Sequence, residues 1–217
     1  MNDGTLKNIK ENSPYYEFLE IDLDAHHEKV RFFEENRGEI YNLDFSYKIF
    51  IWCDYAISVF ELGRYQEFIK LSDELIPTVI NENIFRIRDI DIYSALLFRK
   101  GASLYNINKL EEAEYVFSEL CRIEKDTLHQ KAWTQTIQRI LKGKLRYLQA
   151  ISVLLFIFTA IVIAVELLVI RNFYPALTED FEFFRICTFV SGFLVLIGLE
   201  LYIRFKSIRL FQTRVKK

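Results

Sequence analysis

Glycine and proline are scarce in this chain, with 7 glycines and 3 prolines among 217 residues, against an average usage of about 7% and 5%. A chain with so few turn-forming residues is expected to consist of long helices separated by few breaks. Disorder and collagen-like repeats are excluded as well, because 51% of the residues are hydrophobic and 16% are aromatic. We therefore expect an all-α fold.

Cysteine and histidine are also sparse, with three of each. Cys53, Cys121 and Cys187 lie far apart in apolar runs, so we expect buried thiols in a reducing compartment and no disulfide framework. The histidines have no cysteine or carboxylate at metal-ligand spacing, and the common phosphate-loop, nucleophile and zinc-protease motifs do not occur. The sequence thus predicts no enzyme activity, no cofactor and no metal site.

The net charge of −2 is small, which does not indicate nucleic-acid binding, but it is unevenly distributed. Residues 148–217 carry 8 basic against 5 acidic residues, whereas residues 1–147 carry 20 basic against 25 acidic ones. The chain therefore has two chemically distinct parts.

The C-terminal part contains two long apolar segments. Residues 147–165 carry no charge, and the apolar run resumes after Glu166, which gives a first membrane span at about 148–170. Such a run is long enough, because about twenty helical residues cross the hydrocarbon core. The second span is expected at 183–203; a re-entrant or interfacial segment there is the alternative, because only its centre is uncharged.

Basic residues flank both spans and predict their orientation. They are Lys142, Lys144 and Arg146 before the first span, and Arg204, Lys206, Arg209, Arg214, Lys216 and Lys217 after the second. The intervening loop, 171–184, is mainly acidic, so we expect residues 144–217 to form a two-span hairpin in the plasma (inner) membrane, with both termini cytoplasmic. The basic tail either serves only as this topology signal or also attracts anionic lipid.

The cytoplasmic part has apolar residues at three- and four-residue spacing, which is typical of amphipathic helices. Helices are expected over 24–36, 45–62, 65–82, 85–107, 110–123 and 127–141, the last ended by Gly143. We divide this part into N-terminal helices within 1–45 and a helical domain at 46–143.

The helical domain contains an internal repeat. Residues 60–69 align with residues 105–114, so that Gly63 and Asn108 occupy the same position between two helices. Both residue types tolerate the positive φ of a helix C-terminus. With small residues such as Ala56, Gly101 and Ala113 at positions where helices would touch, the domain resembles the tetratricopeptide repeat (TPR) family, in two degenerate copies.

Two features depart from the family pattern. Phe68 stands where a small alanine is usual, and the copies are forty-five residues apart instead of about thirty-four. We interpret the eleven extra residues as three helical turns that lengthen the facing helices. Residues 127–141 would then form a capping helix.

The resemblance implies a concave surface that binds a protein or peptide. The positions that it assigns to partner binding are Phe50, Cys53, Ile57, Phe60, Phe98, Arg99 and Tyr105. Two interpretations stay open: these residues line an open groove, or the N-terminal helices cover them.

Three ionisable residues lie within or beside the spans, where charge is costly. Glu166 and Arg185 are expected near the outer ends of their helices, where they can form a structural ion pair. Together with Glu200, they could instead line a pore in an oligomer.

Two functions follow from these patterns. The first is a membrane-anchored adaptor, whose cytoplasmic domain binds a partner protein or peptide while the hairpin only anchors it in the bilayer. The second is an oligomeric channel gated by a ligand or partner, an architecture that resembles bacterial anti-phage defence effectors.

Overall fold

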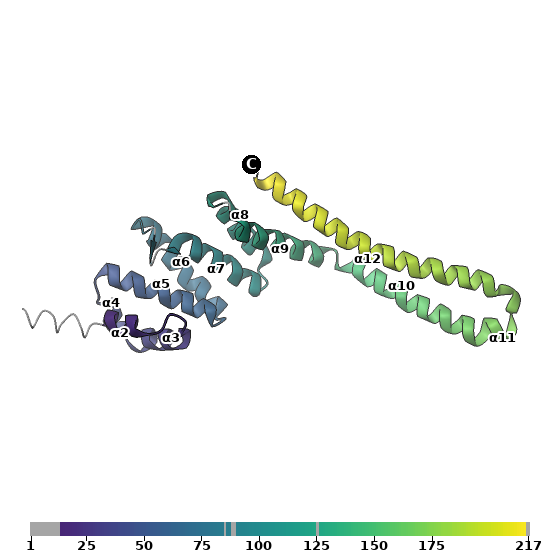
Figure 1. Cartoon of the computed structure of the whole chain (residues 1–217), viewed down its shortest axis with the longest axis horizontal. Coiled ribbons are helices and arrows are strands. Elements are labelled where there is room, and N and C mark those ends of the chain that lie inside the picture. Colours follow the sequence, from purple (N-terminus) through teal and green to yellow (C-terminus); the bar gives the residue numbers. More distant parts are fainter. Residues whose placement is uncertain (1–13, 85, 88–89, 125, 216–217) are drawn as a thin grey trace, which may run out of the picture. The chain divides into compact units, whose positions relative to one another are not determined.

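The computed structural model describes residues 14–84, 86–87, 90–124 and 126–215, and the described chain is mainly helical (Figure 1). The expected all-α class is thereby confirmed, whereas the TPR-like repeat remains a prediction. The chain divides into two compact units, residues 1–133 and 134–217. The division falls within one helix, ten residues before the boundary at 143 that the sequence suggested. Residues 1–13 and 216–217, which belong to the expected N-terminal segment and basic tail, lie outside the described residues.

The first unit begins with three short helices, followed by two helical hairpins. The short helices are α2 (Pro14–Glu20), α3 (His26–Glu35) and α4 (Arg37–Tyr41); the first hairpin is α5 (Phe45–Glu61) with α6 (Tyr65–Asn81), and the second is α7 (Ile92–Asn106) with α8 (Leu110–Ile123). Neighbouring helices pack in the order α3, α5, α6, α7 and α8. Helix α9 (Thr127–Lys144) follows and crosses the boundary between the units.

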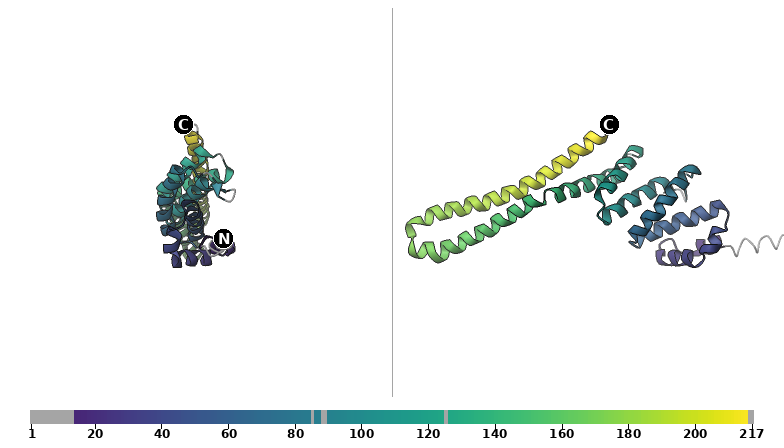
Figure 2. Two further views of the ribbon diagram at one scale, coloured as in Figure 1. Left: turned by 90° about the vertical axis from the view of Figure 1, so that its left-hand side faces the viewer. Right: turned by 180° about the vertical axis from the view of Figure 1, so that it is seen from behind.

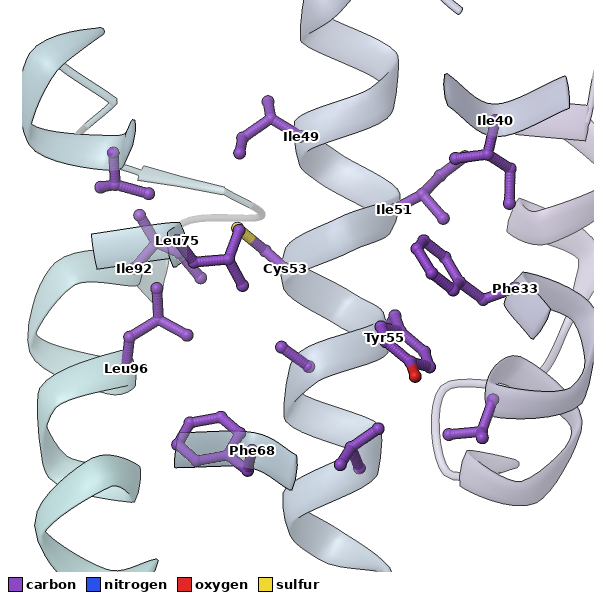
Figure 3. Packing of buried hydrophobic residues seen from close by; sticks show 14 of the residues in the cluster. Phe33, Ile40, Ile49, Ile51, Cys53, Tyr55, Phe68, Leu75, Ile92 and Leu96 are labelled. Atoms are coloured by element: carbon purple, nitrogen blue, oxygen red, sulfur yellow. The ribbon is translucent and has the colours of Figure 1, made fainter. Parts of the chain in front are cut away.

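Helix α5 is the centre of the N-terminal core (Figure 3). Ile51 and Tyr55 face Phe33 and Ile40 of the N-terminal helices, and the rings of Phe33 and Tyr55 stack with centroids 3.9 Å apart. On the other side of α5, Cys53 lies beside aliphatic side chains of α6 and α7, including Leu75, Ile92 and Leu96 (Figure 3). The N-terminal helices therefore cover the side of α5 that carries Ile51 and Tyr55, and not the side that carries the predicted binding residue Cys53.

The two helical hairpins end their first helices in the same way. Gly63 and Asn108 both have positive φ, 75° and 65°. The backbone N–H of the next residue then bonds to a carbonyl five residues back, Arg64 to Val59 at 3.1 Å and Lys109 to Leu104 at 2.9 Å. This 6→1 bond is typical of a helix C-terminal cap, and it agrees with the sequence alignment at this position.

The expected helix over 85–107 is wrong at its start. Residues Arg86–Ile87 (β1) and Ile90–Asp91 (β2) form a short antiparallel ladder, and α7 begins only at Ile92. The helix start is determined by Asp91, whose side chain accepts a hydrogen bond from the backbone N–H of Ser94 at 2.9 Å. The extra residues between the two copies thus include a β-hairpin and do not simply lengthen the helices; Phe85, Arg88 and Asp89 lie outside the described residues.

Gly101 allows close packing of α7 against α8. A Cβ atom at this position would lie 2.7 Å from Cε1 of Phe117, a side chain that is only 2% exposed. Gly101→Ala is therefore expected to destabilise the protein by about 1–3 kcal/mol, since the Phe117 ring must move within a packed core. Chemical denaturation followed by circular dichroism measures this change.

Gly143→Ala is the matched control for this substitution. Gly143 lies inside α9, where a Cβ atom would meet no atom within 4 Å, so alanine should stabilise the helix by about 0.5–1 kcal/mol. If Gly101→Ala left the free energy of unfolding unchanged, the tight contact with Phe117 would be contradicted.

The expectation that Gly143 ends the last helix of this part is wrong, because α9 continues to Lys144.

The second unit contains a helical hairpin whose two long helices, α10 (Arg146–Val165) and α12 (Thr178–Val215), lie side by side (Figures 1 and 2). Between them come a π-helical turn (Glu166–Ile170), the single turn α11 (Arg171–Phe173) and a 3₁₀ turn (Pro175–Leu177). The loop expected over 171–184 is thus shorter, because α12 begins at Thr178. Two continuous helical segments, Arg146–Phe173 and Pro175–Thr213, are long and apolar enough to cross a membrane.

Candidate functional site

A cavity of about 380 Å³ lies among α3, α5, α7 and the β-hairpin; we call it the N-terminal cavity. The residues lining it are Leu23, His26, Lys29, Phe50, Cys53, Asp54, Ile57, Ile87, Ile90, Ile92 and Arg99. Four of the seven predicted partner-binding residues, Phe50, Cys53, Ile57 and Arg99, therefore line one space. The wall is mostly apolar, with charged groups at a few positions.

The first charged group is Lys29, whose side chain is only 2% exposed. Its ammonium group donates to Oδ2 of Asp54 at 3.0 Å and to the carbonyl oxygen of Leu23 at 2.9 Å. A buried ammonium needs such partners, because an unpaired charge in the interior is strongly destabilising. The pair thereby fixes α3, which carries Lys29, against α5, which carries Asp54.

The second charged group is Arg99 of α7. One guanidinium nitrogen pairs with Oε1 of Glu61 at 3.2 Å, and the guanidinium carbon lies 5.6 Å from the centre of the Phe60 ring. Among the described residues, its Nε is buried and has no hydrogen-bond partner. Such a donor costs about 1–3 kcal/mol until an acceptor reaches it.

The thiol of Cys53 is not activated. Burial, together with the nearby Asp54 carboxylate, raises the pKa of Cys53 to about 12. Burial likewise raises the pKa of Cys121 to about 11, with a smaller contribution from Asp126. Since the thiolate is the reactive form, both residues stay neutral thiols at physiological pH.

The remaining predicted partner-binding residues lie elsewhere. Phe98 contacts the rings of Phe117 and His129, with centroids 5.9 and 5.4 Å apart. Phe60 packs on Phe68 and Arg99, and Tyr105 is half-buried and does not line the cavity. These three predicted residues therefore do not line the cavity, although Phe60 contacts Arg99, which does.

Sequence reasoning missed the cavity residues outside the two repeat copies. Lys29 precedes Phe33 by four residues, so it lies on the same face of α3 as this core side chain. That spacing was the signal that could have found it. The helix expected over 85–107 includes Ile87 and Ile90, so it conceals their contribution to the cavity wall.

In the C-terminal hairpin the structure brings Glu166 and Arg185 together. Glu166 has no exposed side-chain surface, and its carboxylate oxygens accept from Arg185 at 2.7 Å and from Arg171 at 3.1 Å. Arg185 also pairs with Glu182 at 3.1 Å. In the π turn that begins at Glu166, the backbone N–H of Arg171 donates to the carbonyl oxygen of Glu166. This turn brings the side chains of Glu166 and Arg171 to the same side of the helix.

Glu200 lies apart from this cluster and is also paired. Its carboxylate lies 3.2 Å from Nζ of Lys142 and 3.6 Å from Nε of Arg204. Hydroxyl groups within the hairpin are hydrogen-bonded as well. Ser152 of α10 donates to the carbonyl of Gly192 of α12 at 3.0 Å, and Thr159 donates to the carbonyl of Leu155 within α10 at 2.8 Å.

Among the described residues, no cluster of three or more His, Cys, Asp or Glu side chains could hold a metal ion. No protein-family profile, curated protein or solved structure shows a significant match to this chain. The resemblance to the TPR family stays a prediction.

Proposed function

We propose that this chain is a membrane-anchored binding protein. In this proposal α10 and α12 cross the plasma (inner) membrane with both termini in the cytoplasm, and the N-terminal unit binds a partner protein or peptide. The N-terminal cavity accepts an apolar anchor side chain of this partner, as hot-spot residues at interfaces commonly fill pockets. The role is one of recognition and not of catalysis.

The observation that carries the proposal is the internal pairing of the hairpin. Its ion pairs and hydroxyl hydrogen bonds close within one copy of the chain. Its outer surface is apolar instead, with exposed side chains such as Ile151, Leu154, Phe158, Phe189, Phe193 and Leu194. A surface of this kind suits lipid, where polar groups must find partners inside the protein.

The same pairing weighs against the channel. A pore needs polar groups that face water in the assembled oligomer. The serine and threonine residues of the spans, Ser152, Thr159, Thr188 and Ser191, each donate to a backbone carbonyl of the hairpin. We therefore favour the anchor over the alternative of a gated channel or defence effector.

The cavity supports binding of an extended segment. An apolar side chain would cover Phe50 and Ile57. A backbone carbonyl beside it could accept from Nε of Arg99, which has no partner among the described residues, after a small shift of the Arg99 side chain. The apolar contact and the hydrogen bond to Arg99 both require that the partner can reach the cavity from the cytoplasm.

Site-specific photo-crosslinking in the cells that produce the protein tests the proposal. A photo-reactive residue at position 57, in the cavity, should yield one discrete adduct in the membrane fraction, and position 115, where Tyr115 is 66% exposed on α8, is the control. Equal adduct patterns from both positions, or adducts only to a second copy of this chain, would argue against cavity-based partner binding.

A further inference from the structure

One face of the last part of α12 combines aromatic and basic side chains around a hollow of about 490 Å³. Its members are Tyr202, Phe205, Lys206, Arg209, Leu210 and Thr213; we call it the α12 basic face. They recur at three- and four-residue spacing, so they share one side of the helix. Phe205 is 71% exposed and Tyr202 48% exposed.

The cations of this face have no ion-pair partner in the part of the chain that the structure describes. Among the described residues neither Lys206 nor Arg209 forms an ion pair, whereas the neighbouring Arg204 pairs with Glu200. Lys206 is oriented by Tyr202 instead: its Nζ donates to the tyrosine hydroxyl at 2.7 Å and lies 5.0 Å from the ring centre. The face therefore presents two unpaired positive charges on an aromatic platform.

The face lies at the depth of lipid headgroups if α12 crosses the membrane as proposed. Position 203 ends the expected span, and at about 1.5 Å per residue Lys206 and Arg209 lie roughly 5 and 9 Å beyond it. The headgroup layer on each side of the hydrocarbon core is about 5–8 Å thick. Aromatic rings at this level and cations just outside it are typical of interfacial anchoring.

We propose that the α12 basic face is a binding site for the phosphate headgroup of an anionic phospholipid in the cytoplasmic leaflet. Lys206 and Arg209 contact the phosphodiester, while Phe205 and Leu210 lie against the adjoining glycerol and acyl carbons. The site goes beyond partner binding, although it rests on the proposed membrane crossing of α12.

The test uses the full chain in a nonionic detergent, titrated with phosphatidylglycerol, with phosphatidylcholine or with inorganic phosphate while the melting temperature is followed. Phosphatidylglycerol alone should raise the melting temperature. The double variant Lys206→Gln/Arg209→Gln should weaken its apparent affinity roughly 30-fold, since each cation near an anionic surface contributes about fivefold. Arg204→Gln, the matched control with a paired cation, should change it less than threefold.

A charge-conserving variant, Lys206→Arg/Arg209→Lys, should keep the affinity and thereby exclude a folding defect. A fivefold weakening by Arg204→Gln, about the loss expected for any one cation near an anionic surface, would show diffuse charge attraction and overturn the site. An equal rise in melting temperature with inorganic phosphate alone would overturn it as well. Flotation of the full chain with pure phosphatidylcholine liposomes separates the two proposals. Flotation without a phosphatidylglycerol effect refutes only the lipid site, whereas failure to float refutes the membrane crossing itself.

Discussion

Glu166→Ala is expected to lower the free energy of unfolding of the C-terminal hairpin by about 3 kcal/mol. The substitution removes the carboxylate that pairs with Arg185 and Arg171 and leaves both guanidinium groups without this partner. Removing one member of a buried pair typically costs about 3–5 kcal/mol. We expect the lower end of this range, because Arg185 keeps its contact with Glu182.

Unfolding of the full chain in mixed micelles by added sodium dodecyl sulfate measures this loss. A donor–acceptor dye pair at positions 147 and 201, where Tyr147 and Leu201 are exposed, reports separation of α10 from α12. Glu179→Ala, which removes an exposed carboxylate of the same hairpin, is the control and should change stability by less than about 0.5 kcal/mol. Equal stability of the Glu166 and Glu179 variants would mean that the buried pair does not hold the hairpin.

Asp54→Ala is expected to destabilise the N-terminal unit by about 3–5 kcal/mol, since it leaves the buried ammonium of Lys29 without its carboxylate. Adding Lys29→Met should restore most of the stability, because an uncharged side chain of similar length fits the apolar surroundings. Urea denaturation followed by tryptophan fluorescence reports on this unit, as Trp52 and Trp133, the two tryptophans of the chain, both belong to it.

Asp73→Ala is the matched control for Asp54→Ala. Asp73 pairs with Lys100 at 2.6 Å, but its side chain is 56% exposed. Exposed pairs contribute about 0–1 kcal/mol because water screens them, so this variant should remain close to the wild-type stability. If Asp54→Ala were equally mild, or if Lys29→Met gave no rescue, the buried pair would not be the contact that joins α3 to α5.

Helix ends were predictable from sequence where the chain itself carries the stop signal. The helices α5, α6 and α8 agree with the expected ranges to within one residue at each end. Gly63 and Asn108 adopt positive φ at little cost, and they end a helix regardless of what surrounds it. Local chemistry of this kind can be read without knowledge of the tertiary contacts.

The β-hairpin could not be predicted in this way. Ile84, Ile87 and Ile90 recur every three residues, a spacing that imitates the apolar face of a helix. The ladder depends instead on the pairing of Arg86 with Asp91 and of Ile87 with Ile90, which no single-residue propensity encodes. The misassigned segment contributes two residues to the cavity wall, so the error in the fold also concealed part of the candidate site.

The sequence predicts only the part of the candidate site that lies within the repeat copies. Phe50, Cys53 and Ile57 recur along one face of α5, and the resemblance to the TPR family assigned all three to one surface. Lys29 and His26 come from a helix outside the repeat copies, and only tertiary packing brings α3 to the cavity. A repeat alignment, which compares two segments of the chain with each other, carries no information on such a contact.

Ion flux through liposomes that contain the purified full chain tests the central claim, that the C-terminal hairpin is a closed anchor. We predict that a trapped ion tracer leaks no faster than from protein-free liposomes of the same lipid, with or without the crosslinked partner. Leakage that rises with the protein-to-lipid ratio and is abolished by substituting Glu200 or Ser152 would contradict the account and establish the channel.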